Sequence, residues 1–347
     1  MKKLFSLLLA ALLIVTCGAA LADPIKVGIV TPDADHGFTG ESVAHARAEI
    51  EAQLAALGAE NLEYKFGVGA EPGIQIAAIE DILTWNPDVF VLWPNEGEAL
   101  RATAESIIAS GAKLIVYDRL IEGLQGFDAE IMGDNVSIGE AMGNYMIEYF
   151  KERLEAGEVL QYLLFIGDSS TVSVQRTEGM LSSINASPYA AQFVQVQQSF
   201  QTDWSNAKSQ EQLEGWLNTS AAEAIADLDL IVTHDDEIVD GLMNALSVFQ
   251  GEQNIKLITS VGGRRETLAT FDDPARSLGV DLVTYFFSPS YIREAIRLAI
   301  ADAKGEQYQG QDIAGQQFLI PSIEIDKDSV EAYRGSQEYI DRYSLGE

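Results

Sequence analysis

Aromatic, carboxylate, amide and arginine side chains recur in this sequence where short apolar runs end. Carboxylates and guanidinium groups can form paired hydrogen bonds with hydroxyl groups, and aromatic faces can cover the apolar C–H patches of a ring-shaped ligand. Such a mixture is typical of a site for a small polyhydroxylated molecule. The candidate ligand-binding residues are Asp35, Phe38, Trp93, Asn95, Asp118, Arg119, Arg176, Trp204, Asp235 and Phe287.

Each candidate also has a structural interpretation, which the sequence alone leaves open. Asp118 and Arg119 follow the apolar run KLIVY directly, so they could be a helix cap and a surface arginine, although the pair suits bidentate binding of hydroxyl groups. Asp235 could cap a helix that begins near Glu237 and contact a ligand at the same time. Arg176 could pair with a nearby acidic residue, and the aromatic candidates could belong to the core.

The residues that catalytic chemistry needs are sparse. His36, His45 and His234 are the only histidines, and none has the spacing of a metal site. Cys17 is the only cysteine, and no G-x-S-x-G elbow, P-loop or G-x-G-x-x-G motif follows an apolar run. We therefore expect a protein that is not an enzyme, with no catalytic residue, no metal and no cofactor. A secreted carbohydrate hydrolase is a remote alternative.

The charge balance excludes whole classes of partner. The chain has 347 residues, of which 22 are basic and 53 acidic, so its formal net charge is −31. Phosphate backbones and anionic membrane surfaces would repel such a protein, and no cluster of lysine and arginine offsets this. The hydrophobic content of 47% is ordinary for a globular protein. We expect no nucleic-acid partner.

The first 22 residues have the pattern of a secretory signal peptide. Lys2 and Lys3 precede a 12-residue, almost wholly apolar run at 4–15, and small residues at 20 and 22 offer a cleavage site. The apolar run is too short to span a bilayer. Lipid attachment at Cys17 is a less favoured alternative, because Thr16 is a poor match to the residues expected before a lipidated cysteine. Both interpretations predict a periplasmic or extracytoplasmic protein.

Apolar runs and amphipathic stretches alternate along the rest of the chain, which predicts an α/β fold with parallel sheets. Eleven strands are too many for one compact doubly wound sheet, so we expect two doubly wound lobes. Ligands of such sheets bind beyond the carboxyl ends of the strands, where the candidate residues stand. The predicted strands are 25–30, 62–68, 88–93, 113–117, 131–132, 160–166, 192–197, 229–233, 255–260, 278–284 and 318–325.

The order of these motifs resembles that of the type I periplasmic sugar-binding proteins of ABC transporters, the ribose, galactose and xylose binders. The resemblance runs from about Pro24 to the C-terminus. Asp118-Arg119 in VYDRLI is similar to the family's ligand-binding pair, and Asp235 stands where the family has a ligand amide. The other matching features are Phe38 after a polar loop, QIAAIEDI at 75–82 with Trp93 and Asn95, Gly133-Asp134-Asn135 followed by Gly139, Arg176 and Trp204.

The sequence also departs from this family, which leaves the identity of the sugar open. Gly262-Gly263 stands where the family often has an aspartate, and Phe286-Phe287 replaces a late amide. Trp93 stands where ribose binders carry an amide.

The resemblance implies a type I periplasmic binding protein fold with a three-crossing hinge. We expect an N-terminal lobe at 23–126 plus 287–313 and a C-terminal lobe at 127–286 plus 314–347, with crossings near 126–130, 286–289 and 312–315. A monomer would capture a monosaccharide or similar polyol between two closing lobes and deliver it to an ABC permease. The alternative is a sensor that presents a sugar or an autoinducer-like furanose to a membrane receptor.

Overall fold

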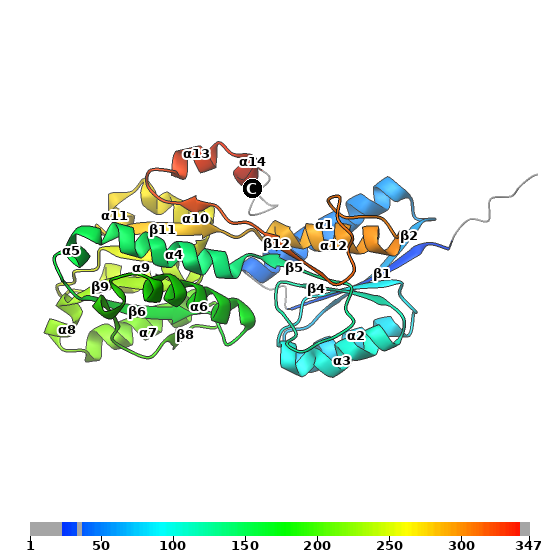
Figure 1. The fold of residues 1–347 in the computed structure, drawn as a ribbon, viewed down its shortest axis with the longest axis horizontal. Coiled ribbons are helices and arrows are strands. Elements are labelled where there is room, and N and C mark those ends of the chain that lie inside the picture. Colours follow the sequence, from blue (N-terminus) through cyan, green and yellow to red (C-terminus); the bar gives the residue numbers. More distant parts are fainter. Residues whose placement is uncertain (1–22, 33–36, 341–347) are drawn as a thin grey trace, which may run out of the picture.

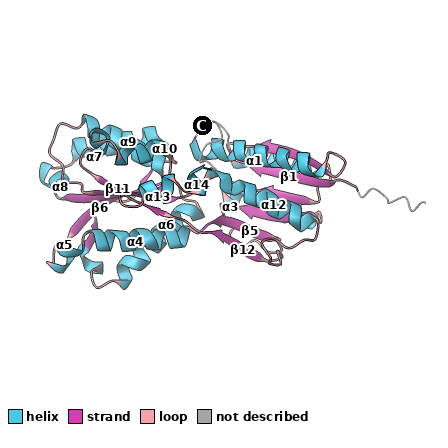
Figure 2. Cartoon of the chain, turned by 90° about the horizontal axis from the view of Figure 1, so that it is seen from above, coloured by secondary structure: helices cyan, strands magenta, loops and turns pink. Residues whose placement is uncertain are grey.

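Runs of aliphatic residues form the central strands of two sheets, one in each of two lobes (Figures 1 and 2). The computed structural model describes residues 23–32 and 37–340. β3 (Val89–Leu92) and β9 (Leu228–Thr233) are buried along their whole length. This is expected of parallel strands whose sheet carries helices on both faces.

The first lobe has a six-stranded parallel sheet in the order β12-β5-β4-β3-β1-β2. Figure 1 shows α1 and α12 on one face of this sheet and α2 and α3 on the other. Its strands are β1 (Ile25–Thr31), β2 (Leu62–Val68), β3, β4 (Lys113–Tyr117), β5 (Ala129–Gly133) and β12 (Gln316–Ile320). Its helices are α1 (Gly37–Leu57), α2 (Pro72–Leu83), α3 (Gly97–Ala109), η3 (Pro289–Tyr291) and α12 (Ile292–Ala303).

The second lobe has the sheet order β13-β11-β10-β9-β6-β7, and β8 also pairs with β6. Only β13 runs antiparallel to its neighbour among these described strands. Its strands are β6 (Leu160–Ile166), β7 (Phe193–Gln195), β8 (Phe200–Gln201), β9, β10 (Leu257–Gly262), β11 (Asp281–Phe286) and β13 (Glu324–Ile325). Its helices are α4 (Asn135–Tyr149), α5 (Lys151–Glu155), α6 (Thr171–Ala186), η1 (Ala190–Gln192), α7 (Asn206–Thr219), α8 (Ala222–Ala226), α9 (Asp236–Val248), α10 (Arg265–Leu268), η2 (Ala269–Phe271), α11 (Pro274–Ser277), α13 (Val330–Arg334) and α14 (Gln337–Ile340).

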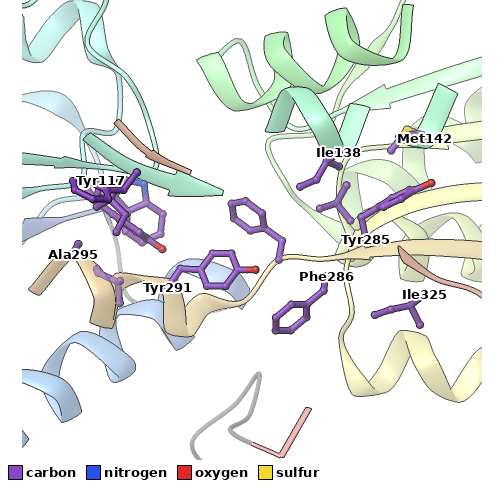
Figure 3. Packing of buried hydrophobic residues seen from close by; sticks show 14 of the residues in the cluster. Tyr117, Ile138, Met142, Tyr285, Phe286, Tyr291, Ala295 and Ile325 are labelled. Carbon is purple, nitrogen blue, oxygen red and sulfur yellow. The ribbon is translucent and has the colours of Figure 1, made fainter. Parts of the chain in front are cut away.

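The chain passes between the lobes three times, at Asp134, at 287–288 and at 321–323. The passages support one another, because the Asp134 amide donates to the Ile320 carbonyl at 2.9 Å and the Phe286 amide donates to the Ile323 carbonyl at 2.8 Å. Figure 3 shows Phe286 and Tyr291 along the second passage, between the lobe that holds Tyr117 and the lobe that holds Tyr285.

Two passages lie later in the chain than the sequence predicts. Residues 127–133 and 314–320, expected in the C-terminal lobe, contain β5 and β12, which pair with each other in the N-terminal sheet. The predicted single strand 318–325 is in fact two strands, one in each sheet. Pro321 has no amide to donate, so pairing with the first sheet ends there and the chain crosses.

Candidate functional site

A cavity of about 210 Å³ lies between the two lobes at the carboxyl ends of their strands. In each sheet it lies beside the switch point of the strand order, between β1 and β3 in one and between β6 and β9 in the other. The structure brings together at its wall Phe38, Trp93, Asn95, Asp118, Arg119, Arg176, Trp204, Asp235 and Phe287. The remaining candidate, Asp35, lies outside the described residues.

Three aromatic rings form one wall of the cavity. Phe38, at the start of α1, meets Trp93 edge to face with ring centroids 5.9 Å apart, and its centroid lies 5.4 Å from that of Phe287. Trp93 packs in turn against Tyr117 at 5.3 Å. The ring of Trp93 is therefore held by the core of the first lobe and also lines the cavity, so the core and ligand interpretations both apply to it.

The Arg176 side chain is buried, at only 2% exposure, and its guanidinium group is held in place by hydrogen bonds. Its Nε donates to Asn135 Oδ1 at 2.9 Å, and its Nη1 donates to the His234 carbonyl at 2.6 Å. Helices α4 and α6 can approach closely because Gly139 has no side chain. A Cβ at this position would lie only 2.3 Å from the Arg176 carbonyl oxygen. The guanidinium lies 4.6 Å from the centre of the Phe287 ring. Arg176 is thus a buried residue of the site and not a surface arginine.

Asp118 and Arg119 follow β4 directly, and both line the cavity. Asp118 has a left-handed backbone with φ of 63°, and its side chain is buried. Burial raises the pKa of Asp118, while the guanidinium groups of Arg119 and Arg176 counteract that rise. Arg119 Nη1 donates to the Asn95 carbonyl at 2.5 Å. Asn95 therefore positions Arg119 as well as lining the cavity.

Arg119 also reaches across to the second lobe. Its Nη2 lies 3.1 Å from an Asp168 carboxylate oxygen, and next to it the Leu120 amide donates to Thr171 Oγ1 at 3.1 Å. Burial alone would raise the pKa of Asp168, but Arg119 and hydrogen bonds from Ser170 hold that pKa below its usual value. These two contacts join the lobes on one side of the cavity.

Trp204 and Phe287 each lie against a glycine. A side chain at Gly167 would place Cβ 2.1 Å from Trp204 Cε2, and one at Gly133 would place Cβ 2.0 Å from Phe287 Cε2. Trp204 itself has a left-handed backbone with φ of 59°. Both rings can reach the cavity because the adjoining strand ends carry no side chain.

Asp235 combines two roles that the sequence left open. Its Oδ1 accepts from the Glu237 amide at 2.7 Å, which caps α9, and its side chain also lines the cavity. Burial raises the pKa of Asp235 to about 8, and the neighbouring carboxylates of Glu237 and Asp236 add to the rise.

Four polar atoms at the cavity wall have unused hydrogen-bonding capacity. Buried donors and acceptors in folded proteins are nearly always paired. Those that make no hydrogen bond of standard geometry with a described residue are Asp118 Oδ1, Arg119 Nε, Trp93 Nε1 and Trp204 Nε1. Trp93 and Trp204 nevertheless lie close enough to Asp118 and Asp168, respectively, to lower the pKa of each carboxyl. One acceptor and three donors at one cavity match the hydrogen-bonding needs of hydroxyl groups, each of which both donates and accepts.

Sequence reasoning missed several residues of this wall. Glu237 was expected only as the start of a helix, and its carboxylate, two residues after Asp235, was the available signal. The others are mostly small or apolar, or lie next to a chosen candidate in sequence, and no pattern of residue types marks them. The missed residues are Pro32, Gly37, Thr39, Ala70, Val172, Asp203 and Glu237.

None of the helices in the described ranges combines the length and the apolarity that crossing a bilayer requires. The predicted signal peptide at 1–22, with Cys17, lies outside the described residues.

Comparisons with known proteins agree with the two-lobed fold. The family described as "Periplasmic binding protein domain" matches residues 27–307. A multiple sugar-binding periplasmic protein of Azospirillum brasilense is 32% identical over 74 residues, and this match covers 21% of each protein. The chain thus matches about a fifth of that curated relative's length.

Solved structures match over nearly the whole chain. An ABC transporter solute-binding protein from Bacillus halodurans with bound myo-inositol has a TM-score of 0.73 at 16% identity, covering 90% of this chain and 98% of that one. The fructose-binding periplasmic domain of a hybrid two-component system has a TM-score of 0.73 at 16% identity, covering 91% and 95%. At such identities the likeness establishes the shared fold. The expected type I fold is confirmed, and the names of these proteins describe binding and no catalysed reaction.

Proposed function

Because the chain belongs to the periplasmic binding protein domain family, we propose that it is an extracytoplasmic receptor for a monosaccharide or a similar polyol. The observation that carries this proposal is the set of buried, unpartnered donors and acceptors at an aromatic-walled cavity between the lobes. Its volume of about 210 Å³ lies below the range of about 300–1,000 Å³ of drug-sized sites, so it suits a small ligand.

Ligand binding would stabilise the closed arrangement of the lobes. Asp118 and Arg119 belong to the first lobe, whereas Arg176, Trp204 and Asp235 belong to the second. A ligand that bonds to both groups favours closure by its differential affinity for the closed state. Closure also removes water from the site, which strengthens each charged hydrogen bond.

The receptor would act as a monomer and deliver its ligand to an ABC permease. The predicted signal peptide supports an extracytoplasmic location, with lipid attachment at Cys17 as the alternative. A sensing role is the second candidate, because the same fold forms the fructose-binding periplasmic domain of a two-component system. The genes next to this one would separate the two roles, since a permease and ATPase pair favours transport.

Calorimetric titration of the mature protein with pentoses, hexoses, deoxysugars and polyols tests the binding function. We expect at least one sugar to bind, and Asp118→Asn to weaken that binding about ten- to a hundredfold, as loss of a hydrogen bond to a charged group does. Asp88→Asn is the matched control, because Asp88 accepts from the Lys26 amide at 2.8 Å, ahead of β3 and far from the cavity. A folded protein that binds no member of the panel contradicts the proposal.

A further inference from the structure

Asn135 is the first residue after the chain has crossed between the lobes for the first time. It begins α4 but does not cap this helix, because the Asp134 side chain accepts from the Ser137 amide at 3.1 Å. The Asn135 side chain is instead buried, at 1% exposure. Capping therefore does not explain why an amide stands at this position.

The Asn135 side chain makes one hydrogen bond among the described residues, and its partner belongs to the cavity wall. Oδ1 accepts from Arg176 Nε at 2.9 Å, whereas Nδ2 makes no hydrogen bond of standard geometry with a described residue. A buried donor in that state lowers stability, and a leucine would fill a similar volume without this cost. The amide is therefore explained by the acceptor that it offers to Arg176.

Close packing of two helices lets this amide reach the guanidinium group. Asn135 lies at the start of α4, and Arg176 lies in the first half of α6. A Cβ at Gly179 in α6 would lie 2.3 Å from the Val136 carbonyl oxygen in α4, just as one at Gly139 would overlap the Arg176 carbonyl. The backbones thus approach closely on both sides of the Asn135–Arg176 hydrogen bond.

The guanidinium group is held from two further sides. Arg176 Nη1 donates to the His234 carbonyl at 2.6 Å, and the Phe287 ring centre lies 4.6 Å from the guanidinium carbon. Phe287 belongs to the second passage between the lobes, and its ring lies against Gly133, the last residue before the first passage. Arg176 therefore contacts residues of both passages, and the hinge and the cavity meet at this side chain.

We propose that Asn135 is a positioning residue for ligand binding, which fixes the Arg176 guanidinium at the cavity wall through the hydrogen bond from Nε. This inference rests on the proposed receptor function and adds a residue that does not itself line the cavity. A guanidinium group has five N–H donors, more than these two acceptors use, so it can also donate to a ligand oxygen. Without the Asn135 acceptor, the ligand itself has to order the group, which lowers the affinity.

Two substitutions of Asn135 test this role by calorimetric titration. The probes are the panel of pentoses, hexoses, deoxysugars and polyols, including D-ribose, D-galactose, L-fucose and myo-inositol. We expect Asn135→Leu to weaken the tightest-binding probe about ten- to a hundredfold. Asn135→Asp keeps an oxygen acceptor for Nε and should stay within about threefold of the wild type. Unchanged affinity in Asn135→Leu refutes the proposal, and so do equal losses in the two variants.

A double variant separates positioning from a general structural effect. In Arg176→Met there is no guanidinium to position, so adding Asn135→Leu should change the remaining affinity by less than about twofold. A purely structural role of Asn135 would weaken binding by the same factor in both backgrounds, and that result would overturn the proposal.

Gln192→Leu is the matched control in the second lobe. The Gln192 side-chain nitrogen donates to the Leu154 and Glu158 carbonyls at 2.8 and 2.7 Å, and Gln192 lies outside the cavity wall. This variant should melt at a lower temperature and bind the probe as the wild type does. If it weakens binding as much as Asn135→Leu, the loss is general and the proposal is refuted. A folded wild type that binds no probe would overturn the receptor function as well, whereas the other outcomes leave that function standing.

Discussion

Gly167→Ala is the sharpest single test of how the second lobe presents its aromatic residue. Gly167 follows β6 directly, and its carbonyl accepts from the Asp203 amide at 2.7 Å. An added Cβ would lie 2.1 Å from Trp204 Cε2 and 2.2 Å from Cδ2, far inside van der Waals contact. The left-handed backbone at Asp203 and Trp204 limits local adjustment, so the indole ring must move away from the cavity.

The expected cost follows from this overlap. Forcing an extra carbon into a packed site costs about 1–3 kcal/mol, and each kcal/mol lowers the melting temperature of a domain of this size by about 2–4 °C. Displacing the ring also removes an aromatic contact of about 0.5–1.5 kcal/mol from the ligand, a loss of roughly two- to tenfold in affinity. Thermal unfolding followed by circular dichroism measures the first effect, and calorimetric titration with the best ligand of the panel measures the second.

Gly215→Ala provides the control in the same lobe. Gly215 lies inside α7, and an added Cβ there meets no atom within 4 Å. Alanine is favoured over glycine in a helix interior by about 0.5–1 kcal/mol, so this variant should melt slightly above the wild type. A Gly167→Ala protein that melts as high as Gly215→Ala and binds ligand normally would refute the assigned role of Gly167.

Three further predictions follow from single contacts. Asp236→Ala removes a buried carboxylate that accepts hydrogen bonds from the hydroxyl groups of Ser260 in β10 and Thr284 in β11, at 2.6 and 2.7 Å. We expect the free energy of unfolding, measured with urea, to fall by about 3–5 kcal/mol. A loss below about 1 kcal/mol would contradict this role. Thr171→Val removes the bond from the Leu120 amide across the lobes, and stopped-flow binding should show faster ligand release with little change in association, whereas unchanged release would exclude a role in closure. The folded-state pKa of about 8 for Asp235 exceeds the ordinary value of about 4, so the folded state holds this proton more tightly. The free energy of unfolding without ligand should therefore fall as pH rises from about 4 to 8, and an equally steep fall in Asp235→Asn would refute Asp235 as its source.

The sheets could be predicted from the sequence because parallel strands between helices must be apolar on both faces. KLIVY at β4 and LQYLLFI at β6 show this pattern without any tertiary information. The region 318–325 could not be resolved in the same way, because its composition is that of one strand. Which sheet each half joins depends on partners that are almost 200 residues away in sequence, such as Ala129 for Gln316.

The positions of the site residues were predictable for a similar reason. Parallel strands of one sheet end at one edge, so polar residues after β3 and β4 must lie near one another. The sequence could not indicate which atoms would be left free. The Asn95 side-chain nitrogen donates to the Gly69 carbonyl at 2.7 Å, whereas Trp93 Nε1 makes no hydrogen bond of standard geometry with a described residue. That difference depends on the path of the loop after β2 and is absent from the local pattern.

Asp235 and Asp236 show most clearly how placement decides the role of a residue. The two are adjacent and identical, and in the sequence only the resemblance to the sugar-binding family favours Asp235 as the ligand-binding residue. At the start of α9 their side chains diverge, and Asp236 turns into the sheet, where hydroxyl groups of β10 and β11 and the Arg264 amide satisfy it. Asp235 turns to the cavity, and among the described residues the Glu237 amide is the only hydrogen-bond donor to its carboxylate. The same chemical group therefore stabilises the fold in one position, and in the other it faces the cavity, where a ligand can form hydrogen bonds with it.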